Sequence, residues 1–558
     1  MNRTLIRSVA IAAALLGLGA CDLSVVNPDK PETERVLASS TDVESLIGTY
    51  YKRWHSGIYG SSTSVALMAM VQSFEDFSSL SNNCMGQRVG IPRAANDNSI
   101  GNGCAGEQSR IYTYENEVNR VASSVLATLD KPGFTLGSTA QDLRAKSFAQ
   151  FLRGISLGYL AMVYDSSAVV DPTTSNEDAG ELKGYNDVAL ASYDALQKAI
   201  DFANAPGTGA GGFPIPAAWI PTSTNLTSAE FVRLIKSYRA RIRANVARTP
   251  AERAAVNWDA VIADAQGGIT ADHDNITNTI SGPFNETINS LYAYGTWHQM
   301  TPFVVGMADV SGSYATWIAK PLTDRGGDGP FFMQTPDLRF PQGATRAAQQ
   351  ADFAITSCNG ASQTCKRYFV NRPNGSDVSS SPNWGLSNYD HARFWSWRTS
   401  GDATARNGKL VFFTKTELDM LEAEGQIRKG NYTAAAALIN KTRTVNGLPA
   451  ITALDNTSPV PGGANCVPKV PVGPAYNTIA CGNMMEAMKY EKRIETAYTH
   501  FAAWFLDGRG WGDLPAGTGL HWAPPYADLQ ARGKSGAQIY STGGGSNPAS
   551  AVKGTYGW

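Results

Sequence analysis

The strongest constraint on the fold is a helical hairpin encoded in TKTELDMLEAEGQIRKGNYTAAAALINKTRTVNGLP, residues 414–449. Thr414, with Glu417 three residues later, has the spacing of a helix capping box. Leu418 and Leu421 then begin an apolar stripe at the intervals that place side chains on one face of a helix. A chain with this pattern has to bury such stripes against neighbouring helices.

The turn of this hairpin is as informative as its helices. Gly430 and Asn431 supply the bend, and Tyr432 and Ala435 begin the second helix. A small residue such as Ala435 lets two helix backbones approach closely. The Gly-Asn-Tyr-x-x-Ala step resembles the turn of a tetratricopeptide repeat, although it is well formed only here.

Three earlier stretches also show helical periodicity, at 141–165, 185–205 and 228–248. We interpret them as diverged relatives of the hairpin. The third carries five arginines and one lysine. A basic amphipathic helix can bind membranes or acids, but these charges are spread around the helix, so we expect a solvated or locally paired surface.

Long loops rich in Gly, Pro, Asn and Ser interrupt the helical stretches, at about 82–110, 205–227, 320–410 and 450–480. Loops of this length in a compact chain are usually functional or indicate that an element has been misassigned; we interpret them as elaborations of the helical scaffold. No shift in composition divides the chain. The sequence therefore predicts one domain over 36–558, mainly α, with loop-rich elaborations on a helical-pair scaffold and few short strands.

Residues 1–20 have the form of a secretory signal peptide. Arg3 and Arg7 give a basic start, and residues 9–18 are apolar or small, far fewer than the ~20 needed to span a bilayer. The Leu-Gly-Ala-Cys ending at Cys21 resembles the lipobox of bacterial lipoproteins, which implies cleavage before Cys21 and lipid attachment to it. The alternative is an ordinary signal peptide with an incidental cysteine.

Residues 21–35 are predicted to be a lipidated tether, because Asn27, Pro28, Asp29 and Pro31 suit a flexible segment. No later stretch is apolar for the ~18 residues typical of a transmembrane helix, so none is predicted. The sequence thus predicts a globular body held at a membrane surface by lipid, which is stable when more than one acyl chain is attached.

Charge and cysteine content bear on the partners and the cellular compartment of the protein. Lys and Arg number 47 against 48 Asp and Glu, so nothing favours nucleic acid as a partner. Six cysteines beyond Cys21 lie as near neighbours, which are Cys84 with Cys104, Cys358 with Cys365, and Cys466 with Cys481. We favour local disulfides of an exported protein, although six free thiols remain the alternative. With no C-x-x-C and scattered histidines, neither a metal nor a cofactor is predicted.

The C-terminal stretch MKYEKRIETAYTHFAAWFLDGRGWGDL, residues 488–514, resembles the terminal signature of the RagB/SusD family of outer-membrane nutrient-binding lipoproteins. The matching residues are Glu491, Arg493, Glu495, Trp504, Asp507, Arg509 and Trp511. Residues 33–54, 151–166 and 421–449 match further family patterns in the same order. The chain departs from the pattern at Thr499 and His500, where the family has Glu-Gly, and at Tyr164-Asp165-Ser166, which lacks a glycine.

The resemblance implies a SusD-like fold, no enzymatic activity, and a lipid anchor at the cell surface. It implies an oligosaccharide cargo passed to a TonB-dependent, SusC-like outer-membrane channel. A peptide cargo, as in the RagB branch, and a helical-repeat scaffold without cargo are the alternatives. In some bacteria an aspartate directly after the lipidated cysteine, the position of Asp22 here, keeps lipoproteins in the inner membrane. The resemblance argues for the outer membrane instead.

Glu491 and Glu495 are four residues apart and therefore share one helix face, where they repel each other unless a cation pairs with them. Arg509 or another arginine could supply it. Paired carboxylates can also act as a glycosidase acid and base. That role requires an open cleft, so we interpret Glu491, Arg493, Glu495, Asp507 and Arg509 as a salt-bridged structural cluster with no catalytic residue.

The loops hold aromatic residues among hydrogen-bonding ones, the composition of a sugar site. Sugar rings lie with their C–H faces on aromatic rings, while polar groups bind the hydroxyls. The predicted ligand-binding residues are Tyr294, Trp297, Trp317, Trp384 and Asn388. Burial in the core is the alternative for each tryptophan. No esterase elbow, zinc-protease motif or phosphate-binding loop occurs.

Overall fold

The computed structural model describes residues 33–544, apart from 62, 78–83, 176–177, 210–212, 278–283, 285–298, 355–364, 375–382, 396–407, 500 and 535–540. Cys21, the signal peptide and most of the tether lie outside these residues. The first helices are α2 (Thr33–Ala38), α3 (Ser40–Tyr59), α4 (Val65–Gln72), α5 (Met85–Val89), α6 (Ser109–Leu129), α7 (Thr139–Val163), α8 (Tyr185–Ala203), α9 (Ser228–Asn245), α10 (Pro250–Ala254) and α11 (Trp258–Gln266). The later helices are α13 (Pro302–Val305), α14 (Ser313–Ala319), α15 (Arg346–Asp352), α17 (Lys415–Arg428), α18 (Tyr432–Arg443), α19 (Met484–Thr496), α20 (Ala503–Trp511) and α21 (Tyr526–Ala531).

The strands are short and join only in antiparallel pairs within the described residues. The pairs are β1 (Ala95–Asn96) with β10 (Thr542–Gly543), β2 (Ser166–Ala168) with β3 (Leu182–Gly184), β4 (His273–Thr277) with β7 (Gly408–Phe413), β5 (Phe369–Asn371) with β6 (Tyr389–His391), and β8 (Lys469–Val472) with β9 (Thr478–Cys481). The prediction of a mainly α chain with few short strands is therefore confirmed.

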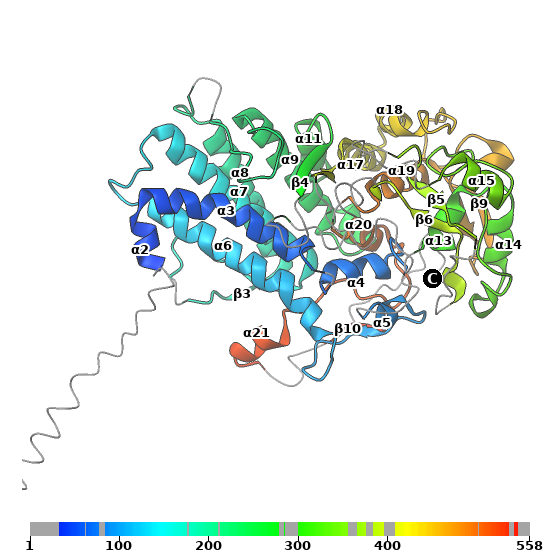
Figure 1. Cartoon of the computed structure of the whole chain (residues 1–558), viewed down its shortest axis with the longest axis horizontal. Helices are drawn as coiled ribbons and strands as arrows, with labels where there is room; N and C mark the ends of the chain where they lie inside the picture. Colours follow the sequence, from blue (N-terminus) through cyan, green and yellow to red (C-terminus); the bar gives the residue numbers. More distant parts are fainter. Residues whose placement is uncertain are drawn as a thin grey trace, which may run out of the picture.

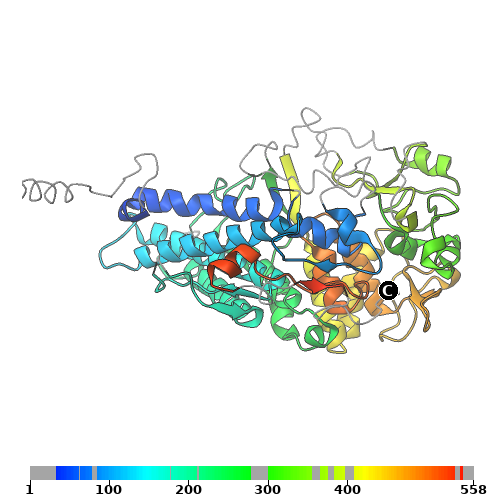
Figure 2. The same ribbon diagram turned by 90° about the horizontal axis from the view of Figure 1, so that it is seen from below.

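The helices pack in sequence order along one side of the molecule (Figure 1). α3 packs on α6, α6 on α7, α7 on α8, α8 on α9, and α9 on α11, after which α17 continues the series to α18 and α19. The view from below shows α3 and α6 running alongside each other (Figure 2). At the opposite end lie α13, α14, α15 and the β5–β6 pair, in the region predicted to be loop-rich.

Close helix packing in the scaffold depends on a missing side chain in α7. A Cβ added at Gly158 would lie 2.3 Å from Ile242 Cδ1 of α9 and 2.9 Å from Ser192 Oγ of α8. Contacts this short do not occur between real side chains, so glycine is what lets α7 lie against both helices at once.

The predicted hairpin at 414–449 forms α17 and α18. Thr414 Oγ1 accepts a hydrogen bond from the Glu417 amide at 3.0 Å, and Gly430 ends the helix with a positive φ of 77°. The predicted capping box is only half formed, however. The Glu417 carboxylate turns inward to Arg241, because a buried guanidinium offers it two charge-assisted hydrogen bonds, of 2.8 and 2.7 Å.

Two arginines of α9 are paired locally, as expected. Another, Arg241, was expected at the surface and is buried instead. Arg239 and Arg243 both bind Asp264, at 2.6 and 3.0 Å. Arg241 is fully buried with Glu417. Sequence periodicity alone could not separate these arginines, because their partners come from other helices.

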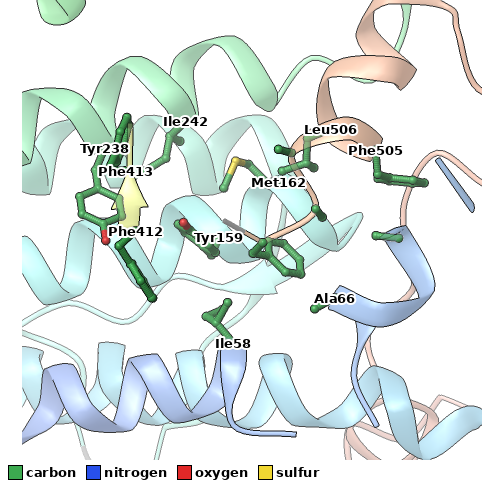
Figure 3. Close-up of a cluster of buried hydrophobic side chains, with 14 of the residues drawn as sticks. Ile58, Ala66, Tyr159, Met162, Tyr238, Ile242, Phe412, Phe413, Phe505 and Leu506 are labelled. Carbon is green, nitrogen blue, oxygen red and sulfur yellow. The ribbon is translucent and has the colours of Figure 1, made fainter. Parts of the chain in front are cut away.

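The main hydrophobic core joins distant parts of the sequence (Figure 3). Its members come from α3, α4, α7, α9, β7 and α20, and the labelled side chains are Ile58, Ala66, Tyr159, Met162, Tyr238, Ile242, Phe412, Phe413, Phe505 and Leu506. These ten residues are at most 1% exposed. The N-terminal helices, the middle of the chain and the C-terminal helices therefore share one core.

Two of the three suggested cysteine pairs are disulfides in the structure. Cys84–Cys104 closes the loop that contains α5, and Cys466–Cys481 joins the ends of the β8–β9 hairpin. Cys358, the suggested partner of Cys365, lies outside the described residues. None of the described helices has the length and apolar character of a membrane span.

Candidate functional site

A cavity of about 490 Å³ opens beside α14 and the loop that follows it. It is lined by small polar, charged and aromatic residues, which are Ser311, Gly312, Ser313, Thr316, Trp317, Lys320, Gly326, Asp328, Gly329, Pro330, Phe331 and Phe332. We call it the Trp317 cavity. All its walls come from one segment of 22 residues, so its shape depends on how that segment is folded.

Buried Asp309 sets the entry to this segment. Its Oδ1 accepts hydrogen bonds from the Ser311 amide at 2.9 Å and from the Ser311 hydroxyl at 2.6 Å. Its Oδ2 accepts from the Tyr314 amide at 2.9 Å. A carboxylate at this position satisfies an amide of the first turn of α14 and favours the start of the helix. Asp309 thereby places Ser311 and Ser313 at the cavity.

The aromatic wall is Trp317, which is 7% exposed and held by three rings. The Trp317 ring lies 4.9 Å from Phe303 in an edge-to-face contact and 6.4 Å from Phe331. The Tyr314 ring stacks on it at 6.1 Å. These contacts fix the indole and bury most of it, so only its small exposed part can contact a ligand in the cavity.

Arg325 holds the C-terminal end of α14 and supports the same indole. Its Nε and Nη2 donate to the carbonyls of Lys320 and Ile318, at 2.9 and 2.8 Å. Its guanidinium carbon lies 4.5 Å from the Trp317 ring centroid, a cation–π distance. Burial lowers the pKa of Arg325 to about 10, which leaves it charged at neutral pH.

Two opposite charges stand at the cavity. Lys320 forms an ion pair with Asp328, whose side chain is 80% exposed. Ser311 and Ser313 hydroxyls lie 2.9 Å apart, and Thr316 donates to the Gly312 carbonyl. The cavity thus offers hydroxyls, one ammonium and one carboxylate around an indole, a set able to bind a polyhydroxylated ligand without a net charge.

Trp384 and Asn388, two of the predicted ligand residues, lie behind the cavity wall. Trp384 is 4% exposed and packs 5.5 Å from Phe303, which in turn contacts Trp317. Asn388 is 5% exposed, and its backbone N–H donates to the Phe331 carbonyl at 2.9 Å. Both support cavity residues and neither lines the cavity, because their apolar neighbours and backbone bonds hold them inside.

Tyr294 and Trp297 lie outside the described residues, so Trp317 is the one predicted ligand residue that the structure places on the cavity. Sequence reasoning missed Lys320, Asp328, Phe331 and Phe332. The stretch DRGGDGPFF at 324–332 reads as a simple turn. The sequence feature that could have indicated these cavity residues is the Phe-Phe pair that follows a glycine-rich turn, close to Trp317.

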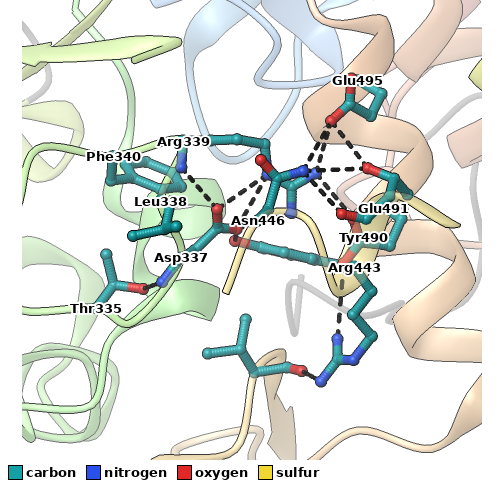
Figure 4. A network of polar contacts seen from close by, with 12 residues as sticks. Thr335, Asp337, Leu338, Arg339, Phe340, Arg443, Asn446, Tyr490, Glu491 and Glu495 are labelled. Carbon is teal, nitrogen blue, oxygen red and sulfur yellow. Dashed lines mark hydrogen bonds and ion pairs between the residues drawn. The ribbon is translucent and has the colours of Figure 1, made fainter. Parts of the chain in front are cut away.

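The acidic pair of α19 belongs to a buried network (Figure 4). Arg339 Nη1 lies 2.8 Å from Glu491 and 3.0 Å from Glu495, while its Nη2 lies 2.7 Å from Asp337. Tyr490 also donates to Asp337, at 2.7 Å. The cation that separates the two glutamates is therefore Arg339, from a loop about 150 residues earlier, and not Arg509.

Two further members of the predicted cluster, Arg493 and Asp507, are ion-paired. The prediction is wrong for Arg509, which donates to the Leu520 and Asn245 carbonyls and has no ion pair among the described residues. Arg493 is an ion-pair partner of Asp513, and Asp507 accepts from Lys492 at 2.8 Å and Arg253 at 3.1 Å. Glu491 is fully buried, and burial raises its pKa although Arg339 opposes the shift. A carboxylate locked to a guanidinium in the interior cannot reach a substrate, so this arrangement gives no support to a glycosidase pair.

Comparison with known proteins places the fold. The sequence matches no protein-family model and no curated protein. A SusD superfamily protein from Parabacteroides distasonis is 11% identical, and the structural alignment covers 90% of this chain and 98% of that one with a TM-score of 0.52. A SusD superfamily protein from Bacteroides vulgatus is 15% identical, with 86% and 89% covered and a TM-score of 0.49.

A laminarin-binding SusD-like protein is 13% identical, with 91% of this chain and 95% of that one covered and a TM-score of 0.43. The Parabacteroides distasonis alignment, with its TM-score of 0.52 over nearly the whole of both chains, supports a shared fold. This chain therefore has the SusD-like fold.

Proposed function

We propose that this protein binds an oligosaccharide in the Trp317 cavity at the cell surface and delivers it to a TonB-dependent outer-membrane transporter. The observation that carries the proposal is a rigid indole surrounded by hydroxyls and one pair of opposite charges, within a SusD-like fold. A sugar ring needs this combination, because its C–H face is apolar and its edge is polar.

The charge of the cavity favours a neutral sugar. Lys320 and Asp328 neutralise each other, so an anionic sugar would have to compete with Asp328 for the ammonium. A neutral sugar can accept a hydrogen bond from Lys320 and donate one to Asp328. Hydrogen bonds to charged groups contribute more to binding than neutral ones.

Trp317→Ala is expected to weaken glycan binding by about 30-fold, the ~2 kcal/mol that a tryptophan anchor typically contributes. The measurement is isothermal titration against a panel of neutral and acidic glycans together with peptides. Trp219→Ala is the matched control, because Trp219 is half-buried against Phe148 of the helical scaffold. Binding of peptides alone would replace the sugar proposal with a peptide cargo.

The surface location rests on the Leu-Gly-Ala-Cys sequence ending at Cys21, and delivery rests on the family resemblance. We expect the protein, solubilised from its native membrane in mild detergent, to co-purify with a β-barrel transporter from the outer-membrane fraction. Recovery in the inner-membrane fraction would point to the effect of Asp22. Recovery from the outer membrane without any transporter would be compatible with glycan binding and would contradict delivery to a transporter.

A further inference from the structure

Arg248 and Arg509 are buried without an ion-pair partner among the described residues, as Arg93 and Arg153 also are. Arg248 is 3% exposed and Arg509 is 1% exposed. Several other buried arginines do form ion pairs, namely Arg241 with Glu417, Arg253 with Glu424, Arg339 with Asp337 and Arg372 with Asp390. In the described part of the chain, no acidic side chain lies within ion-pair distance of Arg248 or Arg509.

The side chains of Arg248 and Arg509 lie near each other and bind neighbouring backbone segments. Arg509 Nη2 donates to the Asn245 carbonyl at the end of α9, three residues before Arg248. Arg509 Nη1 donates to the Leu520 carbonyl at 2.6 Å, and Arg248 Nη2 donates to the Tyr164 carbonyl at 2.6 Å. Tyr164 and Trp522 pair as an isolated bridge, which brings the 520–522 segment against both arginines.

The local potential is strongly positive. Burial, with Arg248 and Arg509 acting in the same direction, lowers the pKa of His521 to about 2, so the imidazole is neutral. Burial and then Arg248 lower the pKa of Arg509 well below its usual value. Asp165 and Glu252 are the acids that act on Arg248, but Glu252 already accepts from the Arg248 backbone amide at 2.8 Å.

The hydrogen-bond donors around the two arginines are also unused. The buried atoms here that make no hydrogen bond to protein are Arg248 Nε and Nη1, Arg509 Nε, Asn245 Nδ2, Trp522 Nε1 and His521 Nδ1. All but His521 Nδ1 can only donate. The orientation of the Asn245 amide is fixed, because its Oδ1 accepts from Arg253 Nη1 at 2.8 Å. The unused atoms at this place are thus mostly donors, the inverse of a cation site.

We propose that a small inorganic anion of chloride type binds between Arg248 and Arg509, with Asn245 Nδ2 as a further donor. Guanidinium groups stay protonated in proteins, so the buried charge has to be compensated by an anion or by dipoles. Carbonyls supply part of this, and an anion supplies the rest while accepting from the unused donors. Water could accept the same hydrogen bonds, but it would not offset the charge.

The test is the thermal midpoint of the purified full-length protein as a function of sodium chloride at constant ionic strength, with sodium gluconate as the bulky replacement. A ligand that binds only the folded state raises the midpoint. We expect a rise of roughly 2 °C or more across the titration. A crystal soaked in sodium bromide should show an anomalous peak within hydrogen-bond distance of both guanidinium groups.

Asn245→Asp gives a sharper readout, because it places a fixed carboxylate where the anion is proposed to sit. We expect this variant to lose the chloride dependence and to be as stable without chloride as the wild type is with it. Asn374→Asp, an exposed change in another loop, should keep the wild-type response. If Asn245→Asp does not fold, the bromide experiment on the wild type decides.

A midpoint independent of chloride, or bromide found only at the protein surface, would overturn the proposal in favour of ordered water. The anion site does not depend on the proposed glycan function, since Arg248 and Arg509 share no residue with the Trp317 cavity. A protein that binds sugar but shows no chloride effect would therefore reject the anion site alone.

Discussion

Arg339→Met is expected to lower the free energy of unfolding by about 3–5 kcal/mol, the cost of leaving buried charges unpaired. Methionine keeps much of the volume and removes the guanidinium that binds Asp337, Glu491 and Glu495. The nearest remaining cation of Glu491 is Arg443 at 3.6 Å, too far for a good hydrogen bond. Urea unfolding followed by circular dichroism measures the loss.

The matched control for this prediction is Arg233→Met, which changes an exposed arginine of α9. It should shift stability by no more than ~0.5 kcal/mol. Adding Glu491→Gln to Arg339→Met removes one of the unpaired carboxylates and should restore part of the loss. If Arg339→Met alone is as stable as Arg233→Met, the ion pairs of Arg339 contribute nothing to stability.

Glu75→Gln is expected to stabilise the protein by about 3 kcal/mol at pH 7 and to have little effect near pH 4. Glu75 is fully buried, and burial raises its pKa from 4.5 to about 8, although backbone amides of Tyr498 and Trp504 oppose the shift. The folded protein therefore holds a proton that the unfolded chain releases above pH 4.5. Between pH 4.5 and 8 the wild type should lose ~1.4 kcal/mol of stability per pH unit through this group.

Glutamine stays neutral at every pH and can still accept the 2.9 Å hydrogen bond from the Tyr498 amide. The measurement is urea unfolding at several pH values between 4 and 8, comparing the slope of stability with pH in the two proteins. Glu422→Gln, which alters a half-buried surface carboxylate, should leave the slope unchanged. Equal slopes for wild type and Glu75→Gln would show that Glu75 is ionised in the folded state.

Sequence patterns predicted the local elements of this fold well, because helices depend on neighbours three and four residues away. The stretch at 185–205 became α8, and Gly430 ends α17 as its turn required. The suggested cysteine pairs Cys84–Cys104 and Cys466–Cys481 are also local, with separations of 20 and 15 residues. In each case the sequence itself holds both partners close together.

Long-range partners could not be predicted in the same way. Nothing in the sequence around Arg339 shows that it lies between Glu491 and Glu495, because their contact depends on how loops cross the scaffold. Glu417 illustrates the conflict directly. Its spacing from Thr414 favoured a cap, but the buried charge of Arg241, 176 positions away, attracted its carboxylate inward.

The candidate site was only partly predictable for a similar reason. Trp317 stood out as an aromatic residue among polar ones, whereas Trp384 looked alike in sequence and lies in the core against Phe303. Composition cannot separate a ring that lines a cavity from a ring that packs behind it. Asp328 was missed because its glycine-rich stretch resembles an ordinary turn.

Binding of a sugar against Trp317 can be seen directly in a crystal of the protein soaked with the glycan that gives the largest heat in titration. We expect density for a sugar ring on the Trp317 indole, with its hydroxyls within hydrogen-bond distance of Thr316, Lys320 or Asp328. Sugar density elsewhere on the protein with an unchanged Trp317 cavity, or a protein that binds no glycan of the panel, would contradict this expectation.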